Sequence, residues 1–164
     1  YLPEDRQKQG LILDWGLGQN VTLSTLEKFT KFTVINRKAE RERSKELLEK
    51  VKTKALSVFD KASSLSGGNQ QKVIVAKVLN SDLKVVILDE PTKGVDVGAK
   101  AQIYEIMSEL AAQGFGVIMI SSEMPEVLGM ADTILVMKEG RVSKIFADAT
   151  GVTQEQILEA AMNM

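Results

Sequence analysis

The sequence predicts an α/β fold in which a helical part precedes a strand–helix–strand part. Residues 85–88 read Val-Val-Ile-Leu, an uninterrupted apolar run that ends in Asp89 and Glu90. A strand that is apolar at every position is typical of a parallel sheet buried on both faces. Upstream of this run, Ser66, Gly67 and Gly68 form a turn in front of a helical stretch. These two features together indicate an α/β core that carries a helical subdomain.

The expected elements follow in order along the chain. Residues 1 to about 24 mix glycines and turn residues with short apolar groups, which predicts loop with short extended pieces. An amphipathic helix is predicted over about 37–56, with an apolar stripe made of Leu47, Leu48, Val51, Ala55 and Leu56. Ser66 is placed to cap the next helix. The later elements are a strand at 84–88, a helix at 98–113, a strand at 116–121, a helix at 124–130, and strands at 133–137 and 141–146 around a turn. A final helix is predicted to start at Thr153, where Gln156 completes a capping box. Its inward residues are expected to be Ile157, Leu158 and Ala161.

Composition limits the possible chemistry. The 164 residues suit one domain, and the net charge of -1 provides no basic field for nucleic acid. The chain has no Cys and no His, so any acid–base chemistry must use carboxylates, Lys or Tyr. No apolar run reaches the roughly 18 residues that span a bilayer. The polar start at Tyr1, without Met, predicts a fragment of a longer protein.

The turn formed by Ser66, Gly67 and Gly68 is a candidate phosphate site. Two glycines let the backbone approach a bulky anion without a Cβ in the way. The helix that follows points free N–H groups and a partial positive charge at the same place. Taken alone, the turn could equally be an ordinary capped helix start.

Asp89 and Glu90 form a second candidate site. Ligands bind at the carboxyl ends of parallel strands. Asp89 offers hard oxygen ligands that suit magnesium, and Glu90 can polarise an attacking water as a general base. The alternative is a strand end held by a structural salt bridge. A phosphate loop of the form Gly-x-x-x-x-Gly-Lys-Ser/Thr is absent, because no glycine of the chain has another glycine five positions on.

Taken together, residues 65–146 resemble ATP-binding-cassette (ABC) ATPases. Residues 65–72, Leu-Ser-Gly-Gly-Asn-Gln-Gln-Lys, are similar to the signature motif, and 85–90 to the Walker B motif. Residues 91–100 look like the D-loop region, with Asp96 as its acidic residue. Ser122 falls where the family has its switch histidine, and Glu4 lies nearest the usual Q-loop glutamine. The resemblance implies a P-loop NTPase-like (RecA-like) core with a mainly parallel sheet and an α-helical signature subdomain, incomplete because the Walker A portion is missing.

The residues of these motifs resemble the second cassette of bacterial monosaccharide importers, which are tandem ATPases of the ribose, galactose, arabinose and xylose type, with ribose favoured. The resemblance implies ATP and Mg²⁺ as cofactors, with Ser66, Gly67, Gly68 and Asn69 contacting nucleotide held on a partner cassette. Asp89 would hold the metal, Glu90 would be the catalytic base, and Glu4, Asp96 and Ser122 would lie at the nucleotide. The implied partners are a second nucleotide-binding domain (a tandem first cassette or a dimer mate), transmembrane permease subunits and, indirectly, a periplasmic sugar-binding protein, at the cytoplasmic face of the inner membrane.

This resemblance also divides the chain. We expect a Q-loop-like segment at 1–19, the helical subdomain at 20–82, part of the core at 83–146 and a C-terminal helix at 147–164. Trp15 and Leu17, in the part that would face the permease, are candidate contact residues, with local packing as the alternative.

Two departures from the family pattern leave alternatives open. Ser122 has one uncharged hydroxyl in place of an imidazole, and Glu4 is acidic where the family has a neutral amide. A catalytically weak cassette that acts as a docking or regulatory module therefore remains an alternative. A DNA-repair-type ABC ATPase is a further alternative, although the chain lacks its long coiled coils and has no basic surface. Without a phosphate loop, the isolated chain is expected neither to bind ATP tightly nor to hydrolyse it.

Overall fold

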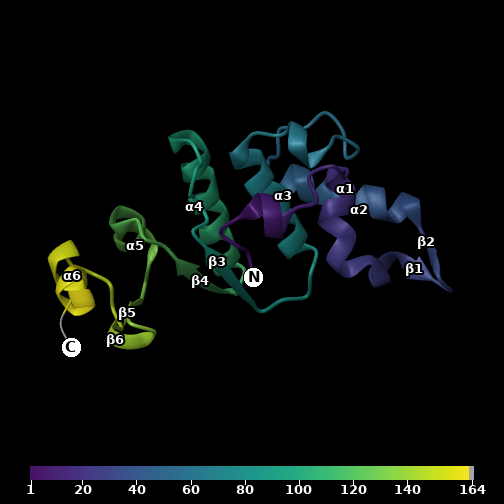
Figure 1. Cartoon of the computed structure of the whole chain (residues 1–164). Coiled ribbons are helices and arrows are strands. Elements are labelled where there is room, and N and C mark those ends of the chain that lie inside the picture. The colour runs from purple at the N-terminus through teal and green to yellow at the C-terminus, as the bar shows by residue number, and fades with distance from the viewer. Residues whose placement is uncertain (163–164) are drawn as a thin grey trace. The chain divides into compact units, whose positions relative to one another are not determined.

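A computed structural model describes residues 1–162 and divides the chain into two compact units. The first unit comprises Tyr1–Ile120, and the second begins at Ser121. Figure 1 labels the elements of both units. The elements of the first unit are the π-helical turn η1 (Arg6–Gly10), α1 (Leu17–Thr22), the 3₁₀ segments η2 (Leu23–Phe29) and η3 (Ala62–Ser64), the hairpin strands β1 (Thr30–Lys31) and β2 (Val34–Ile35), α2 (Arg37–Lys50), α3 (Gly67–Leu79), β3 (Val85–Asp89), α4 (Val97–Ala112) and β4 (Gly116–Ile120).

The central strands confirm the predicted parallel pairing. β3 and β4 run parallel, with Val85 opposite Gly116 and Asp89 opposite Ile120. Leu2 pairs with the other edge of β3: its N–H donates to the Ile87 carbonyl at 2.7 Å, and its own carbonyl accepts from the Asp89 N–H at 3.0 Å. The segment around Leu2 thus runs beside the end of β3, next to the two carboxylates.

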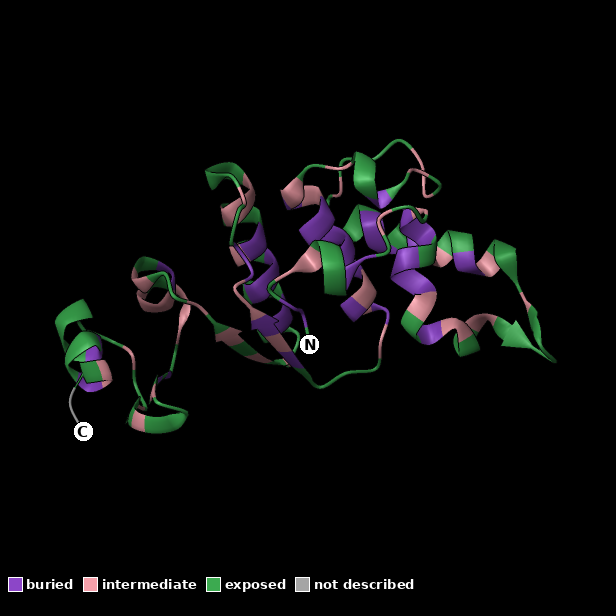
Figure 2. Ribbon diagram, in the orientation of Figure 1, coloured by how far each residue is buried: buried purple, intermediate pink, exposed green. Residues whose placement is uncertain are grey.

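The sheet is covered on one face only within the described residues, which corrects the prediction of burial on both faces. Val86 and Leu88 are buried, whereas Val85, Ile118 and Ile120 are about half exposed, at 51%, 50% and 48%. Figure 2 shows the corresponding change from buried to exposed colours along these strands. The continuous apolar pattern of β3 gives the strand two apolar faces. The helix α4 packs against β4 and can cover only one face of the sheet.

The N-terminal region is more helical than predicted. It contains η1 and α1 where the sequence predicted loop, because burial compensates for a short helix's unfavourable nucleation. α1 packs against α2 and α3, and its Leu17 and Val21 are fully buried. The suggestion that Leu17 contacts a partner is therefore wrong, whereas Trp15 is 42% exposed.

Helix α2 ends earlier than predicted. Asn36 caps its start by accepting from the Ala39 N–H at 3.1 Å, and the helix stops at Lys50. Lys52 has a left-handed backbone (φ 52°), which turns the chain out of the helix. Leu47, Leu48 and Val51 are buried as expected, but Leu56 lies beyond the helix and is fully exposed.

The second unit consists of α5 (Met124–Met130), β5 (Ile134–Lys138), β6 (Arg141–Phe146) and α6 (Gln154–Met162). The predicted hairpin is confirmed: β5 and β6 pair antiparallel around two left-handed residues, Glu139 and Gly140. The capping box is confirmed too, because the Thr153 N–H donates to Gln156 Oε1 at 3.0 Å and the Gln156 N–H to Thr153 Oγ1 at 3.4 Å. The inward residues of α6 are Ile157 and Ala160 rather than Leu158, which is 39% exposed, or Ala161, which packs at the margin of this core.

Candidate functional site

The Ser66–Gly68 turn lies at the N-terminus of α3, as predicted, but Ser66 does not cap the helix with its side chain. Instead, Ser66 Oγ accepts a hydrogen bond from Asn69 Nδ2 at 3.0 Å. Asn69 Oδ1 in turn accepts from the Lys54 N–H at 2.9 Å. Asn69 therefore binds the serine hydroxyl, and the Ser66 side chain accepts no hydrogen bond from the first N–H groups of α3.

Side chains of other segments approach both glycines of the turn closely. A Cβ on Gly67 would lie 2.5 Å from Arg6 Nη2, and a Cβ on Gly68 would lie 2.5 Å from the Ala99 Cβ of α4. Neither position has room for a side chain unless a neighbour moves. The turn is thus packed between the segment that contains Arg6 and the start of α4.

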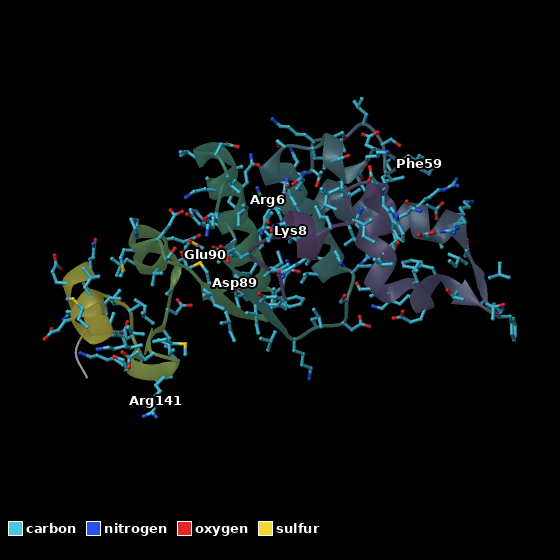
Figure 3. All side chains as sticks on the ribbon, in the orientation of Figure 1. Arg6, Lys8, Phe59, Asp89, Glu90 and Arg141 are labelled. Atoms are coloured by element: carbon cyan, nitrogen blue, oxygen red, sulfur yellow. The ribbon has the colours of Figure 1, made fainter. Side chains whose placement is uncertain are left out.

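Asp89 and Glu90 lie at the carboxyl end of β3, both partly buried. The Tyr1 hydroxyl donates to Asp89 Oδ2 at 2.6 Å, and this bond raises the pKa of Tyr1. Glu90 adopts a left-handed backbone (φ 47°), and its N–H donates to the Ile120 carbonyl at 2.9 Å. Left-handed residues other than glycine occur in turns, as at Glu139, and they also cluster at functional sites. Figure 3 labels both carboxylates beside the end of the strand.

Asp96 and Glu4 each have a structural partner. Asp96 is the N-cap of α4, and its Oδ1 accepts from the Ala99 N–H at 3.0 Å. Glu4 forms an ion pair with Lys93 Nζ in the turn after β3, and this contact raises the pKa of Lys93. The chain therefore brings Glu4, the turn after β3 and the start of α4 to one region of the first unit.

Sequence reasoning missed three residues in this region: Tyr1, Arg6 and Lys93. Tyr1 and Lys93 bind the predicted residues Asp89 and Glu4, and Arg6 lies against Gly67. The sequence offered one signal for Arg6, its position two residues after the predicted site residue Glu4 in the string Pro-Glu-Asp-Arg. Ser122 is exposed and belongs to the second unit, in the loop that follows β4 in the sequence, and its place at a nucleotide stays a prediction.

The predicted metal ligand at the end of β3 is Asp89. Mg²⁺ is commonly held by one or two carboxylates together with substrate phosphates and waters. Asp89 supplies one such carboxylate, and Tyr1 donates to its Oδ2. Within residues 1–162, no three acidic side chains gather into a metal-binding cluster.

No helix in the described part of the chain is long and apolar enough to cross a membrane.

Comparison with known proteins identifies the family. The profile of the family described as ABC transporter matches residues 7–93. The chain belongs to the ABC transporter family. It is 50% identical over 161 residues to the xylose import ATP-binding protein XylG of Geobacillus kaustophilus, covering 98% of this chain and 32% of that protein. It is 47% identical over 161 residues to the ribose import ATP-binding protein RbsA 2 of Rubrobacter xylanophilus, covering 98% and 31%. The chain thus spans about a third of the length of these curated relatives.

Solved ABC cassettes share the fold of this ABC family member. A dimeric post-hydrolysis state of the cassette MJ0796, bound to ADP and Pi, aligns with a TM-score of 0.73 at 23% identity, over 89% of this chain and 62% of that one. MJ1267, an ATP-binding cassette of an ABC transporter, aligns with a TM-score of 0.74 at 21% identity, over 92% and 64%. These alignments confirm the predicted α/β ABC ATPase fold.

Proposed function

We propose that this chain is part of the second cassette of a two-cassette ATPase that couples ATP binding and hydrolysis to monosaccharide import. The observation that carries the proposal is the position of Asp89 and Glu90 at the carboxyl end of a parallel strand, with Glu90 held in a strained backbone. The relatives named for xylose and ribose import support the substrate class. The cofactors would be ATP and Mg²⁺.

Each candidate residue has a role that its chemistry fits. Ser66, Gly67 and Gly68 would contact the γ-phosphate of ATP held on the partner cassette, through the Ser66 hydroxyl and the first N–H groups of α3, and Asn69 would lie at the same nucleotide. Asp89 would hold Mg²⁺, and Glu90 would polarise the attacking water. Asp96 would meet the partner across the interface, while Glu4 and Ser122 would complete the surroundings of the nucleotide.

The partners follow from the same proposal. They are a second nucleotide-binding domain, transmembrane permease subunits at the cytoplasmic face of the membrane, and indirectly a periplasmic sugar-binding protein. The Q-loop-like segment at 1–19 and the adjoining start of the helical subdomain at 20–82 would face the permease, over roughly residues 4–30. Residues 83–146 would form part of the core, and residues 147–164 a C-terminal helix. The half-exposed Trp15 remains a candidate contact.

Replacement of Glu90 by Gln in the full polypeptide tests the catalytic role. A general base contributes roughly 10²–10⁴-fold in rate, so hydrolysis at this site should fall by about that factor while the fold is retained. The measurement is ATP hydrolysis and sugar uptake in reconstituted vesicles. Glu139→Gln is the matched control, because Glu139 is also a left-handed glutamate (φ 49°) but lies in the hairpin turn of the second unit.

A docking or regulatory cassette is the second candidate, and the serine at position 122 favours it, because a hydroxyl cannot replace an imidazole as a charged sensor. Unchanged uptake and hydrolysis in Glu90→Gln would select this candidate. The isolated chain of residues 1–164 should show no ATP hydrolysis under either candidate, because its sequence contains no phosphate loop.

A further inference from the structure

Arg6 joins three segments that are far apart in the sequence. It starts the turn η1, and its guanidinium Nη1 donates to the Lys93 carbonyl at 2.9 Å, while Nη2 donates to the Gly94 carbonyl at 3.4 Å. Among the described residues, its Nε has no hydrogen-bond partner. The side chain therefore acts through its two terminal nitrogens, on two consecutive carbonyls of the turn after β3. Figure 3 labels Arg6 and Lys8 of η1.

The same guanidinium lies against the Ser66–Gly68 turn. A Cβ on Gly67 would be 2.5 Å from Arg6 Nη2 and 3.4 Å from the Gly94 carbonyl oxygen. The planar guanidinium thus occupies the space that the missing side chain of Gly67 leaves. Gly94 itself is left-handed (φ 66°), a backbone conformation that residues with a Cβ rarely adopt.

A second contact joins the same two segments. Glu4, two residues before Arg6, forms an ion pair with Lys93, whose carbonyl oxygen Arg6 binds. Residues 4–6 therefore bind Lys93 at two places: Glu4 pairs with its ammonium group, and Arg6 donates to its backbone carbonyl. Both side chains of the ion pair are at least half exposed, so the Arg6 hydrogen bonds are the better candidates for holding the turn.

We propose that Arg6 is a positioning residue that fixes the turn of residues 91–94 against Gly67 of the signature turn. This inference rests on the proposed function, in which both turns meet the nucleotide or the partner cassette. Arginine suits the task because its planar fork presents donors at a fixed spacing, whereas a lysine ammonium is a single flexible donor group. Loss of the fork would leave both turns present but free to move relative to each other.

Hydrogen exchange measured by mass spectrometry on the full polypeptide tests the contact without relying on activity. In Arg6→Gln, peptides that cover residues 90–96 and 64–69 should exchange about tenfold faster, because two hydrogen bonds from a charged donor are lost. A peptide from the hairpin at 134–146 should not change. Lys8→Gln is the matched control, because Lys8 lies in the same turn with a side chain that is 85% exposed and binds only Asp5 among the described residues.

ATP hydrolysis distinguishes positioning from a general structural role. Arg6→Ala should lower kcat by about tenfold or more with a smaller change in KM, and added methylguanidinium should restore part of the rate in Arg6→Ala but not in Glu90→Gln. Arg6→Lys, which keeps the charge and most of the stem, should retain the fold and show intermediate exchange and rate, and it replaces Arg6→Gln if that variant does not fold.

Unchanged exchange at residues 90–96 in Arg6→Gln or Arg6→Lys would overturn the proposal, and so would altered exchange with full hydrolysis. If Glu90→Gln leaves hydrolysis unchanged, the proposed catalytic function fails, and the exchange experiment alone then decides whether Arg6 holds the two turns together.

Discussion

At the scale of single residues, close approach and backbone strain gather around the proposed chemistry. A Cβ on Gly67 or Gly68 would lie 2.5 Å from a neighbouring side-chain atom. Glu90 adopts a left-handed backbone, and its N–H donates to the Ile120 carbonyl. A residue with a Cβ pays about 1–2 kcal/mol for that backbone conformation. The strained residue is the one that we propose as the general base.

This strain predicts an inverted preference between glycine and alanine at position 90. Glu90→Gly should be more stable than Glu90→Ala by about 1 kcal/mol, because only alanine retains the left-handed penalty. The measurement is urea unfolding of both variants. At Glu109, an exposed residue within α4, the order should reverse, with glycine less stable by about 1 kcal/mol. The same order at both positions would contradict the left-handed conformation of Glu90.

At the scale of elements, two helix starts lie side by side. Gly68, in the first turn of α3, packs on Ala99 in the first turn of α4, and Asp96 caps α4. The acidic residue that the family resemblance places in the D-loop is therefore also the residue that starts a helix. Its contribution to stability can be measured by substitution.

Asp96→Ala should lower the free energy of unfolding by about 1 kcal/mol, because the Ala99 N–H loses its acceptor. Asp96→Asn should keep nearly all of the stability, since an amide oxygen caps a helix as well as a carboxylate does. Urea unfolding measures both. Asp82→Ala, which removes an ion pair with Lys28 whose aspartate is 90% exposed, should cost less than about 1 kcal/mol. An equal loss in the Asn and Ala variants would show that the negative charge matters and the cap does not.

At the scale of the whole molecule, burial separates the two faces of the β3–β4 sheet. Val86 is fully buried, whereas Val85, Ile118 and Ile120 leave about half of their surface exposed. The second unit has its own core of Ile134, Val136, Ile157 and Ala160. Substitutions on the two faces of the sheet should therefore differ in effect although the side chains are chemically alike.

Val86→Thr should cost about 1–3 kcal/mol, because it buries a hydroxyl. Ile118→Thr should cost less than about 1 kcal/mol, because its side chain is half exposed, and it should also weaken the binding of a hydrophobic dye to the isolated chain. Dye fluorescence and thermal unfolding measure the two effects. Equal destabilisation by the two substitutions would mean that both faces of the sheet are covered.

The sequence by itself determined the elements and the candidate chemistry that local patterns encode. The apolar run before Asp89, the turn at Glu139 and Gly140, and the capping box at Thr153 are each read from a few consecutive residues, and the structure places the strand, the hairpin and the helix start there. Local backbone preferences and apolar periodicity act over such short spans, which is why they can be read without a fold.

Only the tertiary structure decided which of these local features meet. Leu17 reads as a residue of an N-terminal loop, yet it is fully buried in a short helix that other helices stabilise. Arg6 reads as one more charged residue, yet it binds a carbonyl 87 positions away and fills the space beside Gly67. Contacts over such separations depend on how strands and helices pack, and no run of neighbouring residues carries that information.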